Sequence, residues 1–216
     1  AGTTSTITYS GTASQTTDSS LFKSNATIVT AFYEGPSKHT TSQYEDWAKN
    51  LFSLEDPIII FTTPSFAPFV QEHRDMHNAM HKTKIVLLDL NKTDTVNMFD
   101  LEFWKEQHSK DPNKQRHKSY HVYWVWLSKL EFVRRAIEMN PFQSEFFAWV
   151  DVGYFRTKTW VGKKFLQHRP NALQKDQVLM LDHHHVGHVG AGFIGGYSKG
   201  LLRYNKIFYD HLKKRQ

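Results

Sequence analysis

The sequence predicts a single α/β domain in which a mostly parallel central sheet is flanked by helices. In the first half, short apolar runs alternate with amphipathic patterns, as in parallel strands joined by crossover helices. The predicted strand at residues 57–62 contains an unbroken apolar run, which is typical of a strand covered on both faces. The chain has 216 residues, of which 39% are hydrophobic, and this is enough for one core.

Residues 1–24 are rich in Ser, Thr and Gly, and this composition predicts a disordered arm or stalk. A β-arm that pairs with another strand is the alternative, because Thr is a good strand residue. The pattern changes at residue 25, so we expect the folded domain to comprise residues 25–216.

The first half of the domain is expected to supply three strands and two helices. The strands are predicted at residues 27–33, 57–62 and 84–89. Ser42 and Glu45 have the spacing of a capping box, which predicts the start of the first helix. Pro64 suits the first turn of the second helix. The inner face of the second helix is expected to carry Phe66, Phe69, His73, Met76 and Met80.

The second half begins with a polar excursion from the sheet at residues 91–119, with a short helical patch. A long amphipathic helix from about Tyr120 to Met139 follows, and Asn140 and Pro141 end it. A hairpin is expected through residues 156–160, and Ser198 is expected to cap a final helix. The remaining strands are predicted at residues 146–150, 177–181 and 191–195.

The composition of the chain indicates which ligands it favours and which kinds of site and cell compartment are expected. Twenty-seven basic residues against 21 acidic ones give a formal charge of +6, which favours anionic ligands. The basic segment 110–118 is better explained as a solvated excursion than as a nucleic-acid surface, so no nucleic acid is expected. The absence of cysteine excludes disulfides and thiolate catalysis. No apolar run reaches about 18 residues, so we expect no membrane span. A soluble protein is expected, with the cytoplasm favoured over the lumen of the secretory pathway.

Asp151 is the most informative residue, because it ends a strongly apolar strand. Ligands of open α/β sheets bind at the carboxyl ends of strands, and hard cations prefer carboxylate oxygen. Asp151 is therefore a candidate metal ligand, although an Asp that caps the next turn would give the same pattern. Gly153 would let a ligand approach the backbone closely, and Arg156 could neutralise a diphosphate or be a surface arginine.

Each of the other candidate site residues has a functional and a structural explanation. Lys129 on the long helix could reach a phosphate or extend its ammonium to solvent. Asp89 could bind a base or ribose, or could be a turn residue. Thr30, Ala31, Phe32 and Tyr33 end the first strand and could form a slot for a flat base, or pack on the core.

A histidine-rich segment follows Asp182. His183, His185 and His188 could form a transition-metal site, or could be part of a polar loop. Asp182 itself is a candidate for metal or acceptor binding. The glycine-rich run at residues 190–196 marks a place where a sugar, an acceptor or a packed helix approaches the backbone.

Several motifs are absent. The sequence has no G-x-G-x-x-G fingerprint after the first strand, no P-loop and no G-x-S-x-G elbow. A dinucleotide-binding Rossmann site, a P-loop nucleotide site and a serine hydrolase are therefore not expected.

The chain resembles the HtrL/YibB family, which belongs with the GT-A nucleotide-sugar glycosyltransferases. The resemblance covers residues 26–215. Its segments are TIVTAFY at 27–33, WAKNLF at 47–52, IIIFT at 58–62, WLSKLEFV at 126–133, AIEMNPF at 136–142, SEFF at 144–147 and WVDVGYFR at 149–156.

The resemblance implies a GT-A-like, Rossmann-like fold, a UDP-sugar donor, a glycan or other hydroxyl acceptor, and a divalent cation, Mn²⁺ or else Mg²⁺. It implies that Ala31, Phe32 and Tyr33 line the nucleobase slot and that Asp151 holds the metal. It also implies that Gly192 and Phe193 lie beside the donor sugar.

Two departures from the GT-A pattern matter. Asp-x-Gly replaces the usual Asp-x-Asp at Asp151, and the chain ends soon after the glycine-rich strand, where GT-A enzymes usually supply another acid and often a His. We expect a metal-dependent glycosyltransferase, with Arg156 or Lys129 assisting the leaving diphosphate and Asp182 as the candidate base. The alternatives are a non-catalytic module that binds glycans or nucleotide-sugars, and a nucleotidyltransferase acting on sugar phosphates.

Overall fold

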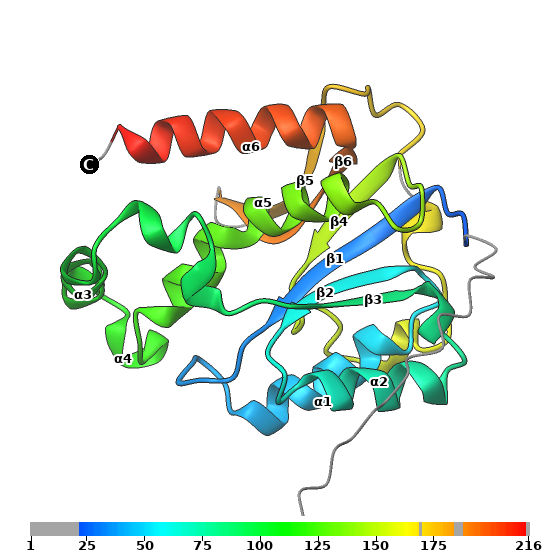
Figure 1. The fold of residues 1–216 in the computed structure, drawn as a ribbon, viewed down its shortest axis with the longest axis horizontal. Coiled ribbons are helices and arrows are strands. Elements are labelled where there is room, and N and C mark those ends of the chain that lie inside the picture. Colours follow the sequence, from blue (N-terminus) through cyan, green and yellow to red (C-terminus); the bar gives the residue numbers. More distant parts are fainter. Residues whose placement is uncertain (1–21, 169, 184–187, 215–216) are drawn as a thin grey trace, which may run out of the picture.

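The computed structural model describes residues 22–168, 170–183 and 188–214, which form one α/β domain (Figure 1). The predicted arm at residues 1–24 lies almost wholly outside the described residues. The strands are β1 (Ala26–Phe32), β2 (Ile58–Thr62), β3 (Thr83–Leu87), β4 (Phe146–Val150), β5 (Val178–His183) and β6 (His188–Tyr197). The helices are α1 (Thr41–Phe52), α2 (Ala67–Met76), α3 (Leu101–Lys110), α4 (Lys114–His117), α5 (His121–Met139) and α6 (Ser198–Lys213).

The six described strands form one mixed sheet in the order β3-β2-β1-β4-β6-β5. Strands β1 to β4 pair in parallel, whereas β6 is antiparallel to both β4 and β5. The expectation of a mostly parallel sheet is thus only partly met. The reason is the short connection between β5 and β6, since a parallel crossover needs a dozen or more residues.

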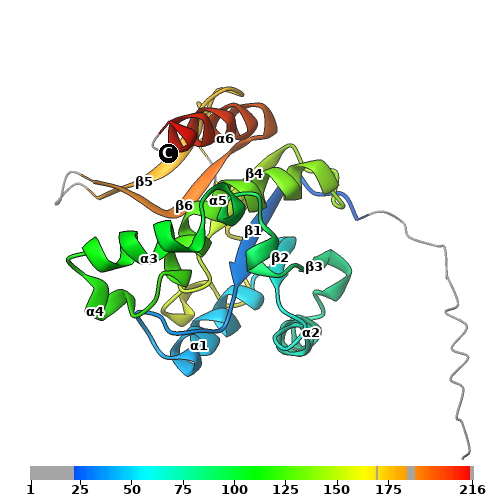
Figure 2. The ribbon, with the colours of Figure 1, turned by 60° about the vertical axis from the view of Figure 1, so that its left-hand side comes forward.

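Helices cover both faces of the sheet (Figure 2). One apolar cluster includes buried residues of α1 and α2 and lies on one face, and the other includes α5 and α6 and lies on the opposite face. The strands β1, β2 and β4 are buried along their whole length, which explains why their sequences are largely apolar.

The order of the strands creates a switch point between β1 and β4. From β1 the chain moves outward to β2 and β3, and it then returns through α5 on the other face to β4 beside β1. Connections that leave on opposite faces open a crevice at the carboxyl ends of the two strands, where open α/β sheets bind ligands. Helices α3 and α4 project beyond the sheet on this side (Figure 1).

Two predicted helix starts were wrong. The capping box of α1 is formed by Thr40 and Gln43 rather than by Ser42 and Glu45, two residues earlier in the sequence. Helix α2 begins at Ala67 with Pro68 in its first turn, because residues 63–66 form a turn that contains Pro64.

Two predictions in the second half also need correction. Residues 158–160 form a short 3₁₀ helix, so no hairpin occurs there. Ser198 is the first residue of α6 rather than its cap, and its hydroxyl donates to the carbonyl oxygen of Glu145 at 3.2 Å.

The inner face of α2 differs from the predicted one. Met76 is 64% exposed, and Met80 lies outside the helix. A charged residue, Arg74, is fully buried on this face instead. Helical spacing alone assigned the apolar Met76 to the core. It could not show that buried carbonyl oxygens on this face of α2 require a hydrogen-bond donor, which Arg74 supplies.

Arg74 donates hydrogen bonds to the carbonyl oxygens of Phe52, Leu54 and Asp56 at 2.7–3.0 Å. Its Nε also donates to the hydroxyl of Thr83 at 2.7 Å. Burial lowers the pKa of Arg74 to about 10, so the guanidinium stays charged at neutral pH. One side chain thus satisfies the backbone between α1 and β2 and joins it to β3.

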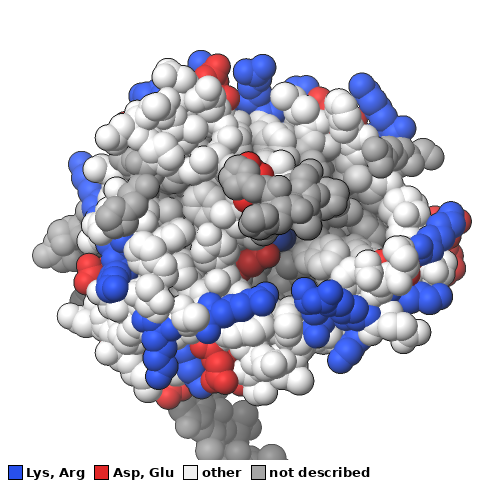
Figure 3. Space-filling model, turned by 180° about the vertical axis from the view of Figure 1, so that it is seen from behind, with Lys and Arg blue, Asp and Glu red and all other residues white. Residues whose placement is uncertain are grey.

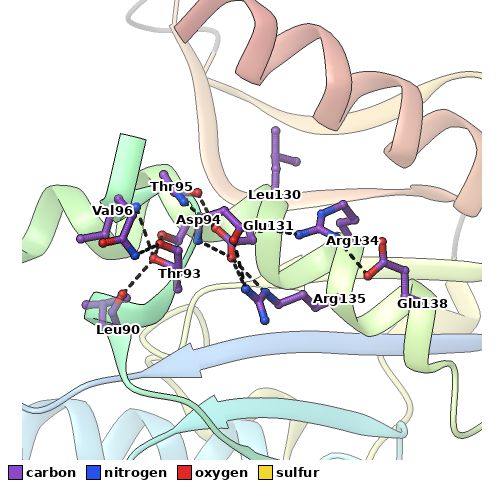
Figure 4. A network of polar contacts seen from close by, with 12 residues as sticks. Leu90, Thr93, Asp94, Thr95, Val96, Leu130, Glu131, Arg134, Arg135 and Glu138 are labelled. Atoms are coloured by element: carbon purple, nitrogen blue, oxygen red, sulfur yellow. Dashed lines mark hydrogen bonds and ion pairs between the residues drawn. The ribbon is translucent and has the colours of Figure 1, made fainter. Parts of the chain in front are cut away.

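A second polar network fastens the segment before α3 to α5 (Figure 4). The buried carboxylate of Glu131 accepts from the backbone N–H groups of Asp94 and Thr95, both at 2.9 Å, and from Arg135. The hydroxyl of Tyr209 on α6 donates to Leu127 at 2.7 Å. This network holds the polar excursion at residues 91–119 against the helical layer.

None of the described helices combines the length and the apolar content that crossing a bilayer requires.

Arg74→Met should lower the free energy of unfolding by about 3 kcal/mol or more, because several buried carbonyl oxygens lose their donor at once. Urea denaturation measures this change. Arg203→Met is the control, because Arg203 is 66% exposed and its replacement should change stability by about 0.5 kcal/mol at most. Equal stability of the two variants would contradict the role assigned to Arg74.

Candidate functional site

A cavity of about 590 Å³ opens at the carboxyl ends of β1 and β4, at the switch point of the sheet. Its walls come from the end of β1 and the loop after it, from α1, from residues 121–129 of α5, and from the tip of β4. Figure 3 shows the back face of the molecule, where acidic atoms lie in a central hollow and basic side chains lie along one rim.

Asp151 lies at the floor of this cavity, directly after β4. Its Oδ1 is 2.7 Å from Nζ of Lys129 and accepts a hydrogen bond from Nε1 of Trp149 at 2.6 Å. The backbone N–H of Asp151 donates to Gly192 on β6 at 2.9 Å. Among the described residues only Oδ1 has a side-chain partner, so Oδ2 is the oxygen that a ligand can use.

Lys129 does not extend to solvent. The residue is 6% exposed, and its ammonium donates to the carbonyl oxygen of Ala191 at 2.9 Å as well as pairing with Asp151. The ammonium also lies 5.6 Å from the ring centroid of Trp149. Lys129 therefore positions Asp151, and both of its observed partners belong to the protein.

The predicted slot for a flat base lies in the same cavity in part. Ala31, Phe32 and Tyr33 line it, but Thr30 is fully buried outside it. Phe32 also packs on the core, with its ring centroid 4.3 Å from that of Phe66. The end of this strand therefore lines the cavity and also packs on the core, and its use as a slot for a base stays a prediction.

Three side chains that line the cavity carry buried polar atoms without a hydrogen-bond partner among the described residues. These atoms are Oη of Tyr33, Nε2 of His39 and Nε1 of Trp124. Burial raises the pKa of Tyr33, and the charge of Asp89 raises it further, so the phenol is neutral and can donate. Asp89 also lines the cavity, and it pairs with Lys92 at 3.2 Å.

Arg156 and Gly153 form part of the wall with Trp47. The guanidinium carbon of Arg156 lies 4.7 Å from the ring centroid of Trp47, and its Nε donates to the carbonyl oxygen of Gly153 at 3.3 Å. A Cβ on Gly153 would lie 2.8 Å from the indole of Trp47. Gly153 thus lets the indole approach the backbone, whereas we predicted that it would admit a ligand.

Besides Thr30, three more predicted site residues among those described lie outside the cavity lining. Asp182 is exposed on β5, opposite Val189 of β6. Gly192 contacts Asp151 through its backbone, and Phe193 is buried in the core. The sequence pattern could not show that these three residues lie outside the cavity lining, because it does not give the position of β5 and β6 relative to Asp151.

The histidine site stays a prediction. His183 and His188 are paired in the ladder of β5 and β6, but their side chains lie outside the described residues, as does His185 altogether. Within the described ranges, no cluster of three or more His, Asp or Glu side chains could hold a metal ion.

Sequence reasoning missed most of the aromatic wall. Four of the six tryptophans line the cavity, namely Trp47, Trp124, Trp126 and Trp149. The segment HVYWVW at residues 121–126 was a usable signal. Its aromatic residues cover more of the helix surface than one core-facing stripe needs, and Trp126 is 43% exposed.

The comparisons with known proteins identify the family. A family model described as "Bacterial protein of unknown function (HtrL_YibB)" matches residues 24–183, which include the switch point and Asp151. The chain belongs to this family. The resemblance drawn from the sequence is thereby confirmed at the level of the HtrL/YibB family.

One curated relative of this HtrL/YibB chain is Protein HtrL of Escherichia coli (strain K12). The two are 26% identical over 152 residues, which are 61% of this chain and 52% of the relative. The chain spans about half the length of that relative.

Gly153→Ala should destabilise the protein by about 1–3 kcal/mol, because the new methyl group would force Trp47 out of its position. Gly192→Ala is the matched control. Its Cβ would meet Oδ2 of Asp151 at 3.6 Å, an ordinary contact, so we expect a change of about 0.5 kcal/mol or less. Urea denaturation of both variants tests the contact, and a Gly153→Ala protein as stable as the control would refute it.

Proposed function

We propose that this HtrL/YibB protein is a GT-A-type glycosyltransferase that moves a sugar from a nucleoside-diphosphate donor, in the first place a UDP-sugar, to a hydroxyl of a glycan or other acceptor. The observation that carries the proposal is the position of the cavity. It lies at the switch point between β1 and β4, with aromatic residues at the end of one strand and a carboxylate at the end of the other.

The two ends of the cavity suit the two parts of such a donor. The flat rings near Ala31 and Tyr33 suit a nucleobase, and the unpartnered polar atoms beside them can form hydrogen bonds with a base or ribose. Asp151 and Arg156 lie where a diphosphate would follow.

A divalent cation fits this site if the phosphates of the donor supply some of its ligands. Mn²⁺ and Mg²⁺ take oxygen ligands, and Asp151 offers only Oδ2, since Oδ1 is already bound by Lys129 and Trp149. A single carboxylate oxygen holds a cation weakly, so the phosphates of the donor would have to supply further ligands. When bound, such a cation stabilises the charge on a leaving diphosphate.

The protein groups have separate roles in this proposal. Lys129 and Trp149 fix the carboxylate of Asp151, and Arg156 assists the leaving diphosphate. In the transfer, an acceptor hydroxyl bonds to the anomeric carbon as the bond to the diphosphate oxygen breaks, and the hydroxyl proton passes to a base. Asp182, the predicted base, lies outside the cavity lining, so this role stays unassigned.

A second candidate is a non-catalytic module that binds nucleotide-sugars or glycans. The ion pair between Asp151 and Lys129 favours it, because a carboxylate that already has a cationic partner binds a metal less strongly. Turnover of a donor distinguishes the two functions.

Asp151→Asn should abolish the part of UDP affinity that depends on Mn²⁺. Calorimetric titration of UDP with and without Mn²⁺ should show at least a tenfold gain with the metal in the wild type, worth about 1.4 kcal/mol, and no gain in the variant. Asp46→Asn is the control, because Asp46 is an exposed residue of α1 whose carboxylate pairs with Lys49.

Transfer or hydrolysis of UDP-sugars should fall at least about a hundredfold in Asp151→Asn if the enzyme assignment is right. Thermal melting of the same sample verifies that the variant is folded. Wild-type turnover at an enzymatic rate would eliminate the binding-module alternative, and undiminished turnover in Asp151→Asn would overturn the role of Asp151.

A further inference from the structure

The cavity carries positive charges that the described acidic residues do not neutralise. Lys38, in the loop after β1, and Arg156, after β4, both line it. Neither has an acidic partner in the part of the chain that the structure describes. The charge of Arg116, on α4, also acts on Lys38.

The acidic residues that line the cavity, in contrast, have partners of their own. Asp151 pairs with Lys129 at 2.7 Å, and Asp89 pairs with Lys92 at 3.2 Å. Glu34 accepts a hydrogen bond from the hydroxyl of Ser65 at 2.9 Å. This bond leaves the negative charge of Glu34 in place. When Lys92 and Arg116 are counted with the lining residues, five cations stand against the three carboxylates of Glu34, Asp89 and Asp151, so the surplus of charge at the cavity is positive.

These cations repel one another. The pKa of Lys38 is lowered by desolvation first and then by the charges of Arg116 and Arg156. The pKa of His39 is lowered by desolvation and by the same three cations. An anion placed among them would offset this repulsion, and a group with two negative charges would do so best.

Arg156 is held in position before any ligand arrives. Its Nε is bound to the carbonyl oxygen of Gly153, and its planar group lies over Trp47. Its two terminal nitrogens have no described acceptor, and an arginine in this state presents a fork that matches two phosphate oxygens.

We propose that Lys38 and Arg156 form a phosphate-binding site at the cavity, which binds phosphoryl groups without Asp151 and without a divalent cation. The inference rests on the proposed function only for the identity of the ligand. The phosphoryl group can come from the diphosphate of the donor or from a phosphate on the acceptor, since both offer the same chemistry.

The direct test is titration of inorganic pyrophosphate into the full chain in the presence of EDTA. Tryptophan fluorescence and calorimetry measure the binding. Trp47 lies under Arg156 and should report binding. Lys38→Gln and Arg156→Gln should each weaken pyrophosphate binding at least about fivefold, and raised salt should weaken wild-type binding. Circular dichroism verifies the fold of each variant.

Lys49→Gln is the matched control, because Lys49 lies on α1 in an exposed ion pair with Asp46, outside the cavity lining. Its affinity for pyrophosphate should equal that of the wild type. Absence of pyrophosphate binding in EDTA, or equal affinities in Lys38→Gln, Arg156→Gln and this control, would overturn the site.

Competition assigns the source of the phosphoryl group. If pyrophosphate displaces UDP, the site serves the donor; if both bind together and glucose 6-phosphate displaces only pyrophosphate, it serves a phosphorylated acceptor. The outcome is separable from the proposed function. Pyrophosphate binding without donor turnover would retain the phosphate site and remove the transferase. Donor turnover, together with wild-type affinity for pyrophosphate in both Lys38→Gln and Arg156→Gln, would retain the transferase and remove the phosphate site.

Discussion

The ion pair between the buried Lys129 and the partly exposed Asp151 joins the three parts of the molecule that meet at the cavity. Lys129 comes from α5, Asp151 from the end of β4, and the carbonyl oxygen that Lys129 also binds comes from β6. A buried ammonium is tolerated only when such partners surround it, so the helix, the parallel strands and the antiparallel strand have to keep their relative positions. The geometry of the candidate site therefore depends on the same contacts that hold the layers together.

The general position of the site followed from the sequence because it depends on few features. An apolar strand that ends in one acid, and alternating strands and helices before it, place Asp151 at the carboxyl edge of a sheet. The same reasoning found Ala31, Phe32 and Tyr33. The extent of the parallel pairing was less accessible, because the direction of β6 depends on a short connection between strands rather than on their composition.

Contacts between residues far apart in sequence were beyond prediction. Lys129 was recognised as a candidate, but nothing in its neighbourhood indicated that its ammonium would bind Asp151 rather than a ligand. Arg74 was missed, since the carbonyl oxygens that require it lie in a connection 18–22 residues earlier. Lys38 belongs to a loop, and only the assembled cavity places it near Arg156.

Arg74 also has a consequence for the order of folding. Its partners lie between Phe52 and Thr83, so the contacts close only short loops of chain. The pairing of β1 with β4, in contrast, joins Ala26 to Phe146 and must wait for a far larger loop to close. We expect the β1–β3 half to be structured in the folding transition state, and the cavity, which needs β4, to be completed last.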